Sequence, residues 1–188
     1  MDPMRNRLWI AGAALIAPAL MAAGLSTLSL GEGSRVWVQG TSSVRSYRCE
    51  SAQVGGTVDA GSTRLVDLAV GGARITIPVA SLDCRNNTMN GHMRTALKAP
   101  QAPTISFLAT DVRVSGGTAR LTGDLSIAGQ TRPVSIDATV AEENGRLRVR
   151  GSKAIVMTEW GVRPPSLMMG TMRVSPNATV GFDVLLQQ

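Results

Sequence analysis

Residues 121–140 read LTGDLSIAGQTRPVSIDATV, and this stretch decides the class of fold. Apolar or small residues recur at every second position, on odd numbers over 121–127 and on even numbers over 134–140. A period of two is that of a β-strand with one buried face. Folding the two runs about residues 130 and 131 brings their apolar sets together, in the pairs Ile127–Val134, Leu125–Ile136, Gly123–Ala138 and Leu121–Val140. We therefore predict an antiparallel hairpin whose dry face the rest of the chain covers.

The composition of the 188 residues also favours an all-β domain. Hydrophobic residues make up 44%, which is enough for a core, while glycine is abundant (20) and aromatic residues are scarce (3%). The formal charge is +6, and Lys98 and Lys153 are the only lysines among 19 basic residues. Nucleic acid is not expected as a partner, because the arginines are scattered and do not cluster with aromatic residues. An anionic membrane surface is the other partner that such a charge suggests.

Residues 1–33 are predicted to be a signal peptide or an N-terminal anchor, and residues 34–188 to be the folded domain. Arg5 and Arg7 precede an uncharged run over residues 8–30, which is the pattern of a secretory segment. The run is long enough to span a bilayer, which needs about 20 apolar residues. Cleavage is favoured over retention as an anchor, and in either case the domain is expected to be exported to the periplasm or the extracellular space.

Export changes the interpretation of the two cysteines, Cys49 and Cys84. Outside the cytoplasm an even number of cysteines indicates a disulfide. This one would close a loop of about 35 residues, worth roughly 3–4 kcal/mol in the chain-entropy model. Two free buried thiols are the alternative.

The rest of the chain adds further short alternating runs and one helical one. Residues 81–99 have apolar side chains at three- and four-residue steps, which predicts a short helix capped by Asn86 or Asn87. A change of parity after residue 109 predicts a β-bulge near Thr110 and Asp111. Strands are expected at residues 35–39, 53–59, 64–70, 73–79, 104–109, 146–157 and 178–186, besides the hairpin.

About eight sequential antiparallel strands can close into a barrel or stack as a β-sandwich. Small residues at inward positions, namely Ala109, Gly123 and Ala138, favour a barrel with space inside. We therefore predict an all-β fold, an eight-stranded antiparallel lipocalin-like barrel with one short helical insertion.

Four motifs resemble those of the YceI-like family of lipid- and polyisoprenoid-binding proteins. They are IPVASLDCRNN (77–87), TMNGHMRTALKAPQAPTISF (88–107), LTGDLSIAGQTRPVSI (121–136) and EWGV (159–162). Their order and spacing also agree with the family, and the resemblance covers most of residues 35–187. It implies an extended eight-stranded barrel with an elongated apolar cavity for an isoprenoid chain.

The candidate ligand-binding residues follow from this resemblance and from the alternation. The expected cavity walls are Ile75, Ile77, Ile105, Phe107, Leu125, Ile127, Val134, Ile136 and Phe182. Gly123 and Ala138 are expected to face one another and to provide room, so that Gly123→Leu would reduce ligand capacity before it harmed the fold. The alternative is a filled core with no cavity.

Two further groups are expected at the end of the barrel. His92, the single histidine, is placed by the resemblance near the cavity mouth, where it would contact a head group. Its alternative role is that of a polar helix residue bonded to a neighbouring strand. Soft apolar side chains are expected to form a lid over the cavity or simply to pack over the barrel end: Met157, Trp160, Met168, Met169 and Met172.

Enzyme signatures are missing from the sequence. It has no nucleophile elbow, no Gly-rich phosphate loop and no HExxH motif, and one histidine makes a metal site improbable. We predict an exported protein, not an enzyme, that holds an isoprenoid or quinone-type lipid without chemistry. No other cofactor is expected; a peripheral membrane contact and homo-oligomerisation stay open. The alternative function is a filled-core barrel that serves as an envelope structural or protein-interaction module.

Overall fold

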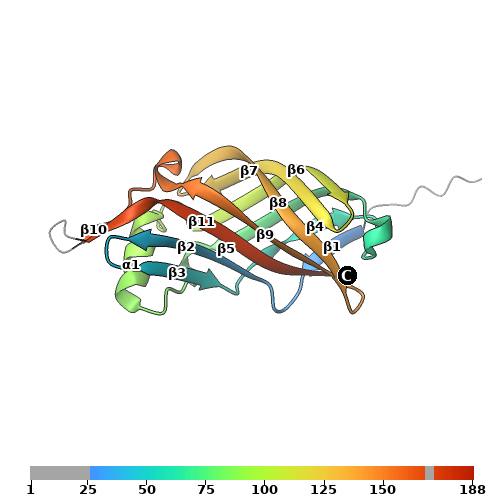
Figure 1. Ribbon diagram of the computed structural model, residues 1–188, viewed down its shortest axis with the longest axis horizontal. Helices are drawn as coiled ribbons and strands as arrows, with labels where there is room; N and C mark the ends of the chain where they lie inside the picture. Colours follow the sequence, from blue (N-terminus) through green and yellow to red (C-terminus); the bar gives the residue numbers. More distant parts are fainter. Residues whose placement is uncertain (1–25, 168–171) are drawn as a thin grey trace, which may run out of the picture.

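The computed structural model describes residues 26–167 and 172–188, and in these residues eight antiparallel strands close into a barrel (Figure 1). The ring runs β1-β4-β5-β6-β7-β8-β9-β11 and closes where β11 pairs with β1. The eight-stranded antiparallel barrel is therefore confirmed. Its strands are β1 (Ser26–Leu30), β4 (Gly55–Ala60), β5 (Val70–Pro78), β6 (Thr104–Ser115), β7 (Thr118–Ile127), β8 (Gln130–Glu143), β9 (Arg146–Val156) and β11 (Met172–Gln187).

Two strands extend the wall beside β11, which is longer than its neighbour β1. β1 pairs with β11 only at its last residues, where Leu30 lies opposite Leu186. β2 (Arg35–Ser42) then continues along the same edge of β11, and β3 (Ser46–Ser51) pairs with β2. A short strand, β10 (Ser166–Leu167), pairs with the start of β11.

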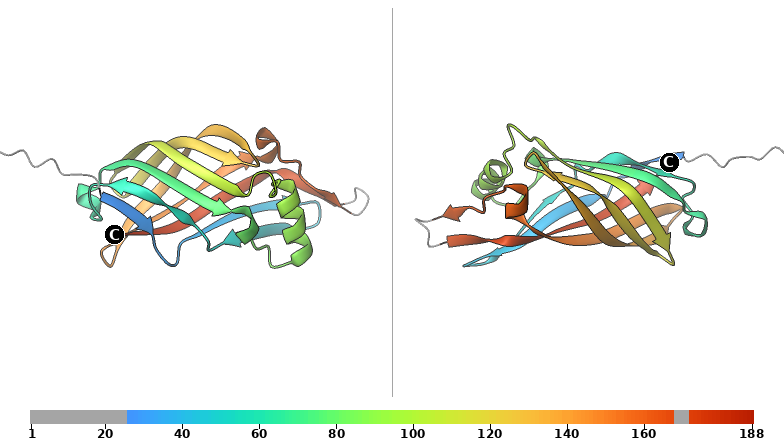
Figure 2. Two further views of the ribbon diagram at one scale, coloured as in Figure 1. Left: turned by 180° about the vertical axis from the view of Figure 1, so that it is seen from behind. Right: turned by 90° about the horizontal axis from the view of Figure 1, so that it is seen from above.

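One α-helix is present among the described residues, and this helix, α1 (Asn87–Ala96), lies at one end of the barrel together with β10 and the β2–β3 turn (Figure 2). The predicted cap is confirmed, because the Asn86 side chain accepts a hydrogen bond from the Met89 backbone N–H at 2.9 Å. The described part of the chain also contains three 3₁₀-helices: η1 (Leu65–Asp67), η2 (Val79–Ser81) and η3 (Met157–Trp160). The strand expected at residues 64–70 is wrong, because η1 occupies three residues of that segment and the next strand, β5, begins only at Val70.

The folded domain begins earlier than the expected boundary at residue 34. β1 pairs with β4 and β11, and the Leu28 side chain is only 1% exposed in the core. The five residues of β1 end the uncharged run, whose composition alone indicates a targeting segment. Their own alternation, with Leu28 and Leu30 two residues apart, was the available signal for a strand. The remainder of that segment, residues 1–25, lies outside the described residues.

The central hairpin forms, but its expected register is wrong by four residues. The turn is at Ala128 and Gly129, both with positive φ (50° and 79°), so Leu125 lies opposite Arg132. A two-residue turn with two positive φ angles matches the twist of the strands that it joins. An even shift keeps every side chain on its face, so the predicted apolar face is correct.

The predicted bulge is confirmed, and it explains the glycine that faces it. The β6–β7 register shifts between Ala109 and Asp111. At this point a Cβ added to Gly123 would lie 2.1 Å from the Leu108 carbonyl oxygen. Gly123 is therefore required by the close approach of two backbones.

The wall is weakly paired at two places, both near the α1 end. β8 and β9 pair only over residues 138–143 and 146–151, and beyond that η3 packs against β8. β3 is joined to the chain after η2 by one bridge, between Glu50 and Asp83. Both backbone hydrogen bonds of that bridge form, at 2.9 and 2.8 Å.

The predicted disulfide is confirmed, and it covers the second of these places. Cys49, next to Glu50 in β3, is bonded to Cys84, next to Asp83. Cys49 is fully buried and Cys84 is 8% exposed. The disulfide therefore adds a covalent link between β3 and the segment after η2, which are otherwise paired by a single β-bridge.

Candidate functional site

The barrel encloses an elongated apolar cavity of about 510 Å³. Its volume lies within the 300–1,000 Å³ that is usual for small-molecule sites in proteins. The lining side chains of β6 run from Ile105 to Val114, a distance of about 30 Å along an extended strand. The barrel is therefore hollow along much of its length, as the resemblance implied, and the alternative of a filled core does not hold.

Most of the candidate wall residues do line this cavity. They come from β5, β6, β7, β8, η3, β11 and α1, so the predicted residues bring most of the barrel to the cavity. The predicted residues on its surface are Ile75, Ile77, His92, Ile105, Phe107, Leu125, Ile127, Ile136, Met157, Trp160 and Phe182.

Three of the candidate residues are buried but do not reach the cavity: Gly123, Val134 and Ala138. Gly123 lies opposite Val134, and Ala138 lies opposite Ala119, so the expected Gly123–Ala138 pair does not form. A larger side chain at position 123 would meet the β6 backbone, so the expectation that Gly123→Leu would first reduce ligand capacity is also wrong. Ala138 pairs with Gly151, over which the Phe182 ring lies.

The cavity reaches solvent between the β2–β3 turn and the start of α1. Arg45, Asn86 and Thr88 line the cavity and are also exposed, which defines this opening; we call it the mouth. At the opposite end the lining residues are buried, like Ala119 and Leu147, or half-buried, like Val114, and none is exposed. We call that end the closed end.

Polar lining residues gather at the mouth, whereas the deeper walls are apolar. Tyr47 lies across from Gly40, where an added Cβ would come within 2.6 Å of the Tyr47 phenol oxygen. Burial raises the pKa of Tyr47, so its phenol stays a neutral hydrogen-bond donor at the mouth. His92 lies on α1 and is half-buried at the same opening, as the resemblance implied.

Lys153 is a lining residue that the sequence analysis did not single out. It lies on β9, two residues from the buried Ile155, and is half-buried where β8 and β9 no longer pair. The alternation of β9 places Lys153 on the same face as Leu147 and Val149. The alternation in the sequence already places Lys153 on the inner face. A charged residue at this position, however, usually indicates that the buried part of the strand has ended.

Two of the five side chains expected as a lid, Trp160 and Met157, lie in the barrel wall where β8 and β9 no longer pair. Trp160 of η3 is 3% exposed, and its indole N–H donates a hydrogen bond to the Leu125 carbonyl oxygen at 3.0 Å. Met157 lines the cavity beside it. Trp160 therefore closes a gap in the barrel wall. Met168 and Met169 lie outside the described residues, and Met172 lines the mouth.

Comparison with known proteins shows to which family this barrel belongs. The sequence profile of the YceI-like domain matches residues 32–186, which is most of the chain. The chain belongs to the YceI-like family. Curated relatives match over shorter stretches. A UPF0312 protein of Pseudomonas paraeruginosa is 28% identical over 98 residues, or 48% of this chain and 51% of that protein. Protein YceI of Escherichia coli O6:H1 is 33% identical over 66 residues, or 34% and 35%.

Two solved structures share the barrel at low sequence identity. BcnA of Burkholderia cenocepacia has a TM-score of 0.70 at 19% identity, covering 82% of this chain and 96% of its own. A polyisoprenoid-binding domain from Saccharophagus degradans has a TM-score of 0.65 at 13% identity, covering 87% and 98%. The chain spans about half the length of the Pseudomonas relative. The profile match establishes the family, and the solved structures establish the fold.

Two absences concern residues 26–167 and 172–188 alone. In that part of the chain, no three His, Cys, Asp or Glu side chains are grouped so that they could hold a metal ion. None of its helices is long and apolar enough to cross a membrane.

Proposed function

We propose that this protein binds the apolar chain of an isoprenoid or quinone-type lipid inside its barrel and carries out no chemistry on it. The observation that supports the proposal is the elongated apolar cavity of about 510 Å³ with one polar mouth. Burial of a hydrocarbon chain gains roughly 25 cal/mol per Å² of apolar area. The YceI-like neighbour from Saccharophagus degradans, a polyisoprenoid-binding domain, supports the same ligand class.

The polar residues at the mouth and Lys153 give the ligand an orientation. The apolar chain enters the barrel, and the polar end stays with Tyr47 and His92 at the opening. A few polar groups beside a large apolar surface are the usual basis of specificity in such sites. Export remains part of the proposal, and the Cys49–Cys84 disulfide fits an oxidising compartment.

The proposal is tested by the lipids that the protein carries. Mass spectrometry of lipids extracted from natively purified protein should find a polyprenol or a quinone, and added polyprenol should raise the Tm of delipidated protein. Ala73→Phe places a ring in the cavity from β5 and should abolish both effects. Ala154→Phe makes the same change at an exposed position of β9 and should abolish neither. Absence of both lipid and stabilisation in the wild-type protein would refute the proposal.

A further inference from the structure

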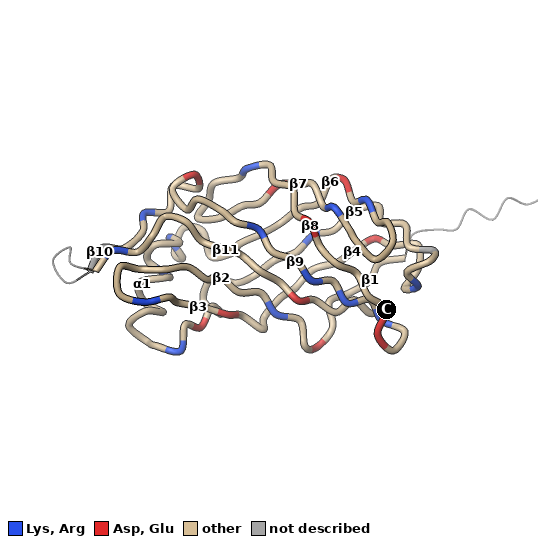
Figure 3. The backbone as a smooth tube through the Cα atoms, in the orientation of Figure 1, with Lys and Arg blue, Asp and Glu red and all other residues tan. Residues whose placement is uncertain are grey.

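The two ends of the barrel differ in charge, and the mouth end is the basic one. The described segments that surround the mouth (residues 43–45, 79–103, 128–129, 157–167 and 172–173) carry six basic residues and two acidic residues, Asp83 and Glu159. The connections of the other half (residues 31–34, 61–69, 116–117 and 144–145) carry one basic and two acidic residues. Figure 3 shows Lys and Arg positions around α1 and β10, and further ones along the strands of the wall.

Six arginines of the described strands form ion pairs with carboxylates, whereas five exposed basic residues of the mouth end form none. The ion pairs found among the described residues use arginines of the strands, such as Arg120 with Asp137 and Arg148 with Asp183. None of those ion pairs involves the exposed mouth-end residues Arg45, Arg85, Arg94, Lys98 and Arg163. Cations without carboxylate partners keep their charge available for an external anionic surface.

An exposed apolar side chain stands at the tip of this basic end. Val44, in the β2–β3 turn, is 70% exposed and is followed by Arg45. The turn is tied to the start of β11, because the Ser43 N–H donates to the Arg173 carbonyl oxygen at 2.9 Å. Arg45 also lines the cavity, so the apolar tip and the basic residues are continuous with the mouth.

We propose that the mouth end is a docking surface for an anionic lipid bilayer, with Val44 entering the headgroup region and the basic residues facing the lipid phosphates. Each Lys or Arg near such a surface contributes about a fivefold gain in binding. The orientation places the cavity opening against the bilayer, so an apolar ligand passes between membrane and barrel without crossing water. Docking of this kind depends on the charge and exposure of the mouth end and not on the identity of the ligand in the cavity.

The test is co-sedimentation of the full chain with vesicles of phosphatidylglycerol and phosphatidylcholine, with pure phosphatidylcholine vesicles as the reference. The wild-type protein should prefer the anionic vesicles, and about 0.5 M salt should remove the preference. Arg45→Glu combined with Arg163→Glu should weaken the binding to anionic vesicles by at least about twentyfold. Val44→Asp should weaken it by about fivefold or more.

Matched variants at the closed end keep the test specific. Arg64→Glu with Arg146→Glu makes the same change in net charge, and Val66→Asp alters a valine that is 78% exposed. These variants should bind anionic vesicles almost as the wild-type protein does. The proposal is overturned if the wild-type protein shows no preference for anionic vesicles, or if the two sets of variants lose binding equally. The Tm of every variant shows whether it is folded. The lipid content of the cavity is measured separately from vesicle binding, so that failure of this proposal can be told apart from failure of the proposed function.

Discussion

Gly123 and Gly91 both interrupt regular elements, but their surroundings give the same substitution opposite consequences. A Cβ on Gly123 would lie 2.1 Å from the Leu108 carbonyl oxygen and 2.7 Å from the Ala109 Cα. A Cβ on Gly91, in the middle of α1, would have nothing within 4 Å. One glycine permits two strands to approach at a bulge, whereas the other only adds backbone freedom to a helix.

Gly123→Ala should therefore destabilise the protein, and Gly91→Ala should stabilise it. The first change forces β6 and β7 apart, which we expect to lower the free energy of unfolding by about 3 kcal/mol or more. The second removes a helix-weakening glycine and should raise it by about 0.5–1 kcal/mol. Urea unfolding of both variants measures the two effects. A Gly123→Ala variant as stable as the wild-type protein would contradict the close approach.

The alternation of single residues predicted which side chains face inward, but it could not identify a glycine's neighbour. Leu125, Ile127 and Ile136 line the cavity because parity alone decides the face. The contact of Gly123 with Leu108 depends on a bulge in another strand, whose exact pairing is set by the closed barrel. Lys153 shows the same limit, since its place at a gap between two strands depends on where their pairing ends.

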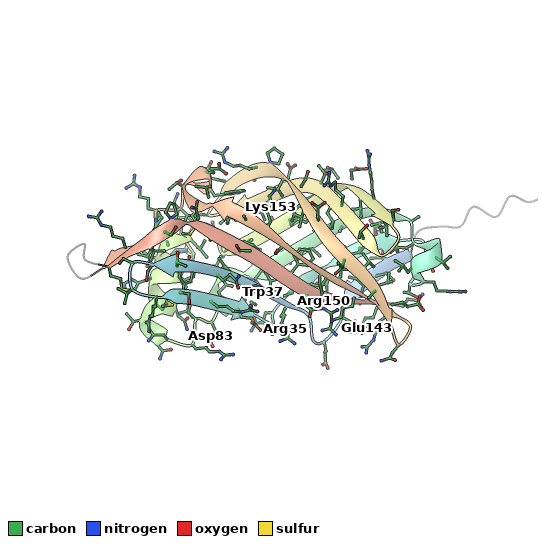
Figure 4. The ribbon with its side chains drawn as sticks, in the orientation of Figure 1. Arg35, Trp37, Asp83, Glu143, Arg150 and Lys153 are labelled. Atoms are coloured by element: carbon green, nitrogen blue, oxygen red, sulfur yellow. A yellow bond between two sulfur atoms is a disulfide. The ribbon has the colours of Figure 1, made fainter. Side chains whose placement is uncertain are left out.

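At the scale of elements, an ion cluster ties β8, β9 and β11 on the outer face of the barrel. Asp183 accepts hydrogen bonds from Arg148 at 2.6 Å and from Arg150 at 3.2 Å, and both arginines also contact Glu143. Figure 4 shows Arg150 and Glu143 on this face. Burial acts to raise the pKa of Asp183, but the hydrogen bonds from Arg148 and Arg150 outweigh it, so the pKa is lowered.

The lowered pKa of Asp183 predicts a loss of stability in acid. Because the folded state favours the ionised form, its contribution is fully present above the unfolded pKa of about 3.9 and disappears as the pH falls through the lower folded value. Asp183→Asn should cost about 1–2 kcal/mol at pH 7, since solvent screens part of the cluster, and should flatten the dependence of stability on pH below about 4.

Asp137→Asn is the control for this measurement. Asp137 also pairs with an arginine, Arg120, but both side chains are largely exposed, at 75% and 64%. Exposed ion pairs contribute little to stability. Thermal unfolding from pH 3 to pH 7 should therefore separate the two variants. Equal losses of stability in the two variants would show that burial of the Asp183 cluster does not determine its contribution to stability.

The Cys49–Cys84 disulfide should stabilise the barrel at its weakest seam. Replacing both cysteines by alanine should lower the free energy of unfolding by roughly 3–4 kcal/mol, the value for a loop of 35 residues. Dithiothreitol should lower the Tm of the wild-type protein to that of the variant and leave the variant unchanged. If the reductant lowers both Tm values equally, the effect does not come from this disulfide.

The local sequence pattern predicted the features that depend on neighbouring residues. It did not predict the features that depend on how the strands pair in the closed barrel. The helix cap at Asn86 and the bulge after Ala109 follow from local signals, and both are present. The hairpin register was missed because Arg132 occupies an inward position at the rim, where its side chain donates a hydrogen bond to the Glu159 carbonyl oxygen. A polar residue there interrupts the alternation, although the strand continues through it.

At the scale of the whole molecule, the sequence predicted a barrel but could not show that it is hollow. Alternation gives the same apolar inner face whether side chains meet across the axis or leave a cavity. The difference depends on how far the walls stand apart, and this follows from closure of β11 on β1 and on β2. The mouth likewise combines the β2–β3 turn with α1, which are about forty residues apart in the sequence.

The elongated cavity predicts that its closed end limits the length of the bound chain. Ala119 lines the cavity at that end, six residues of β7 or about 20 Å along the strand from Leu125. Ala119→Phe should keep the binding of short prenols and lose that of long ones, whereas Ala73→Phe, placed nearer the middle, should lose both. Each ring enters empty space, so each variant should lose less than about 1 kcal/mol of stability, against 1–3 kcal/mol in a filled core. Competition between prenols of increasing length, with bound lipid quantified by mass spectrometry, measures the difference; identical length profiles in the two variants would show that depth does not select the chain.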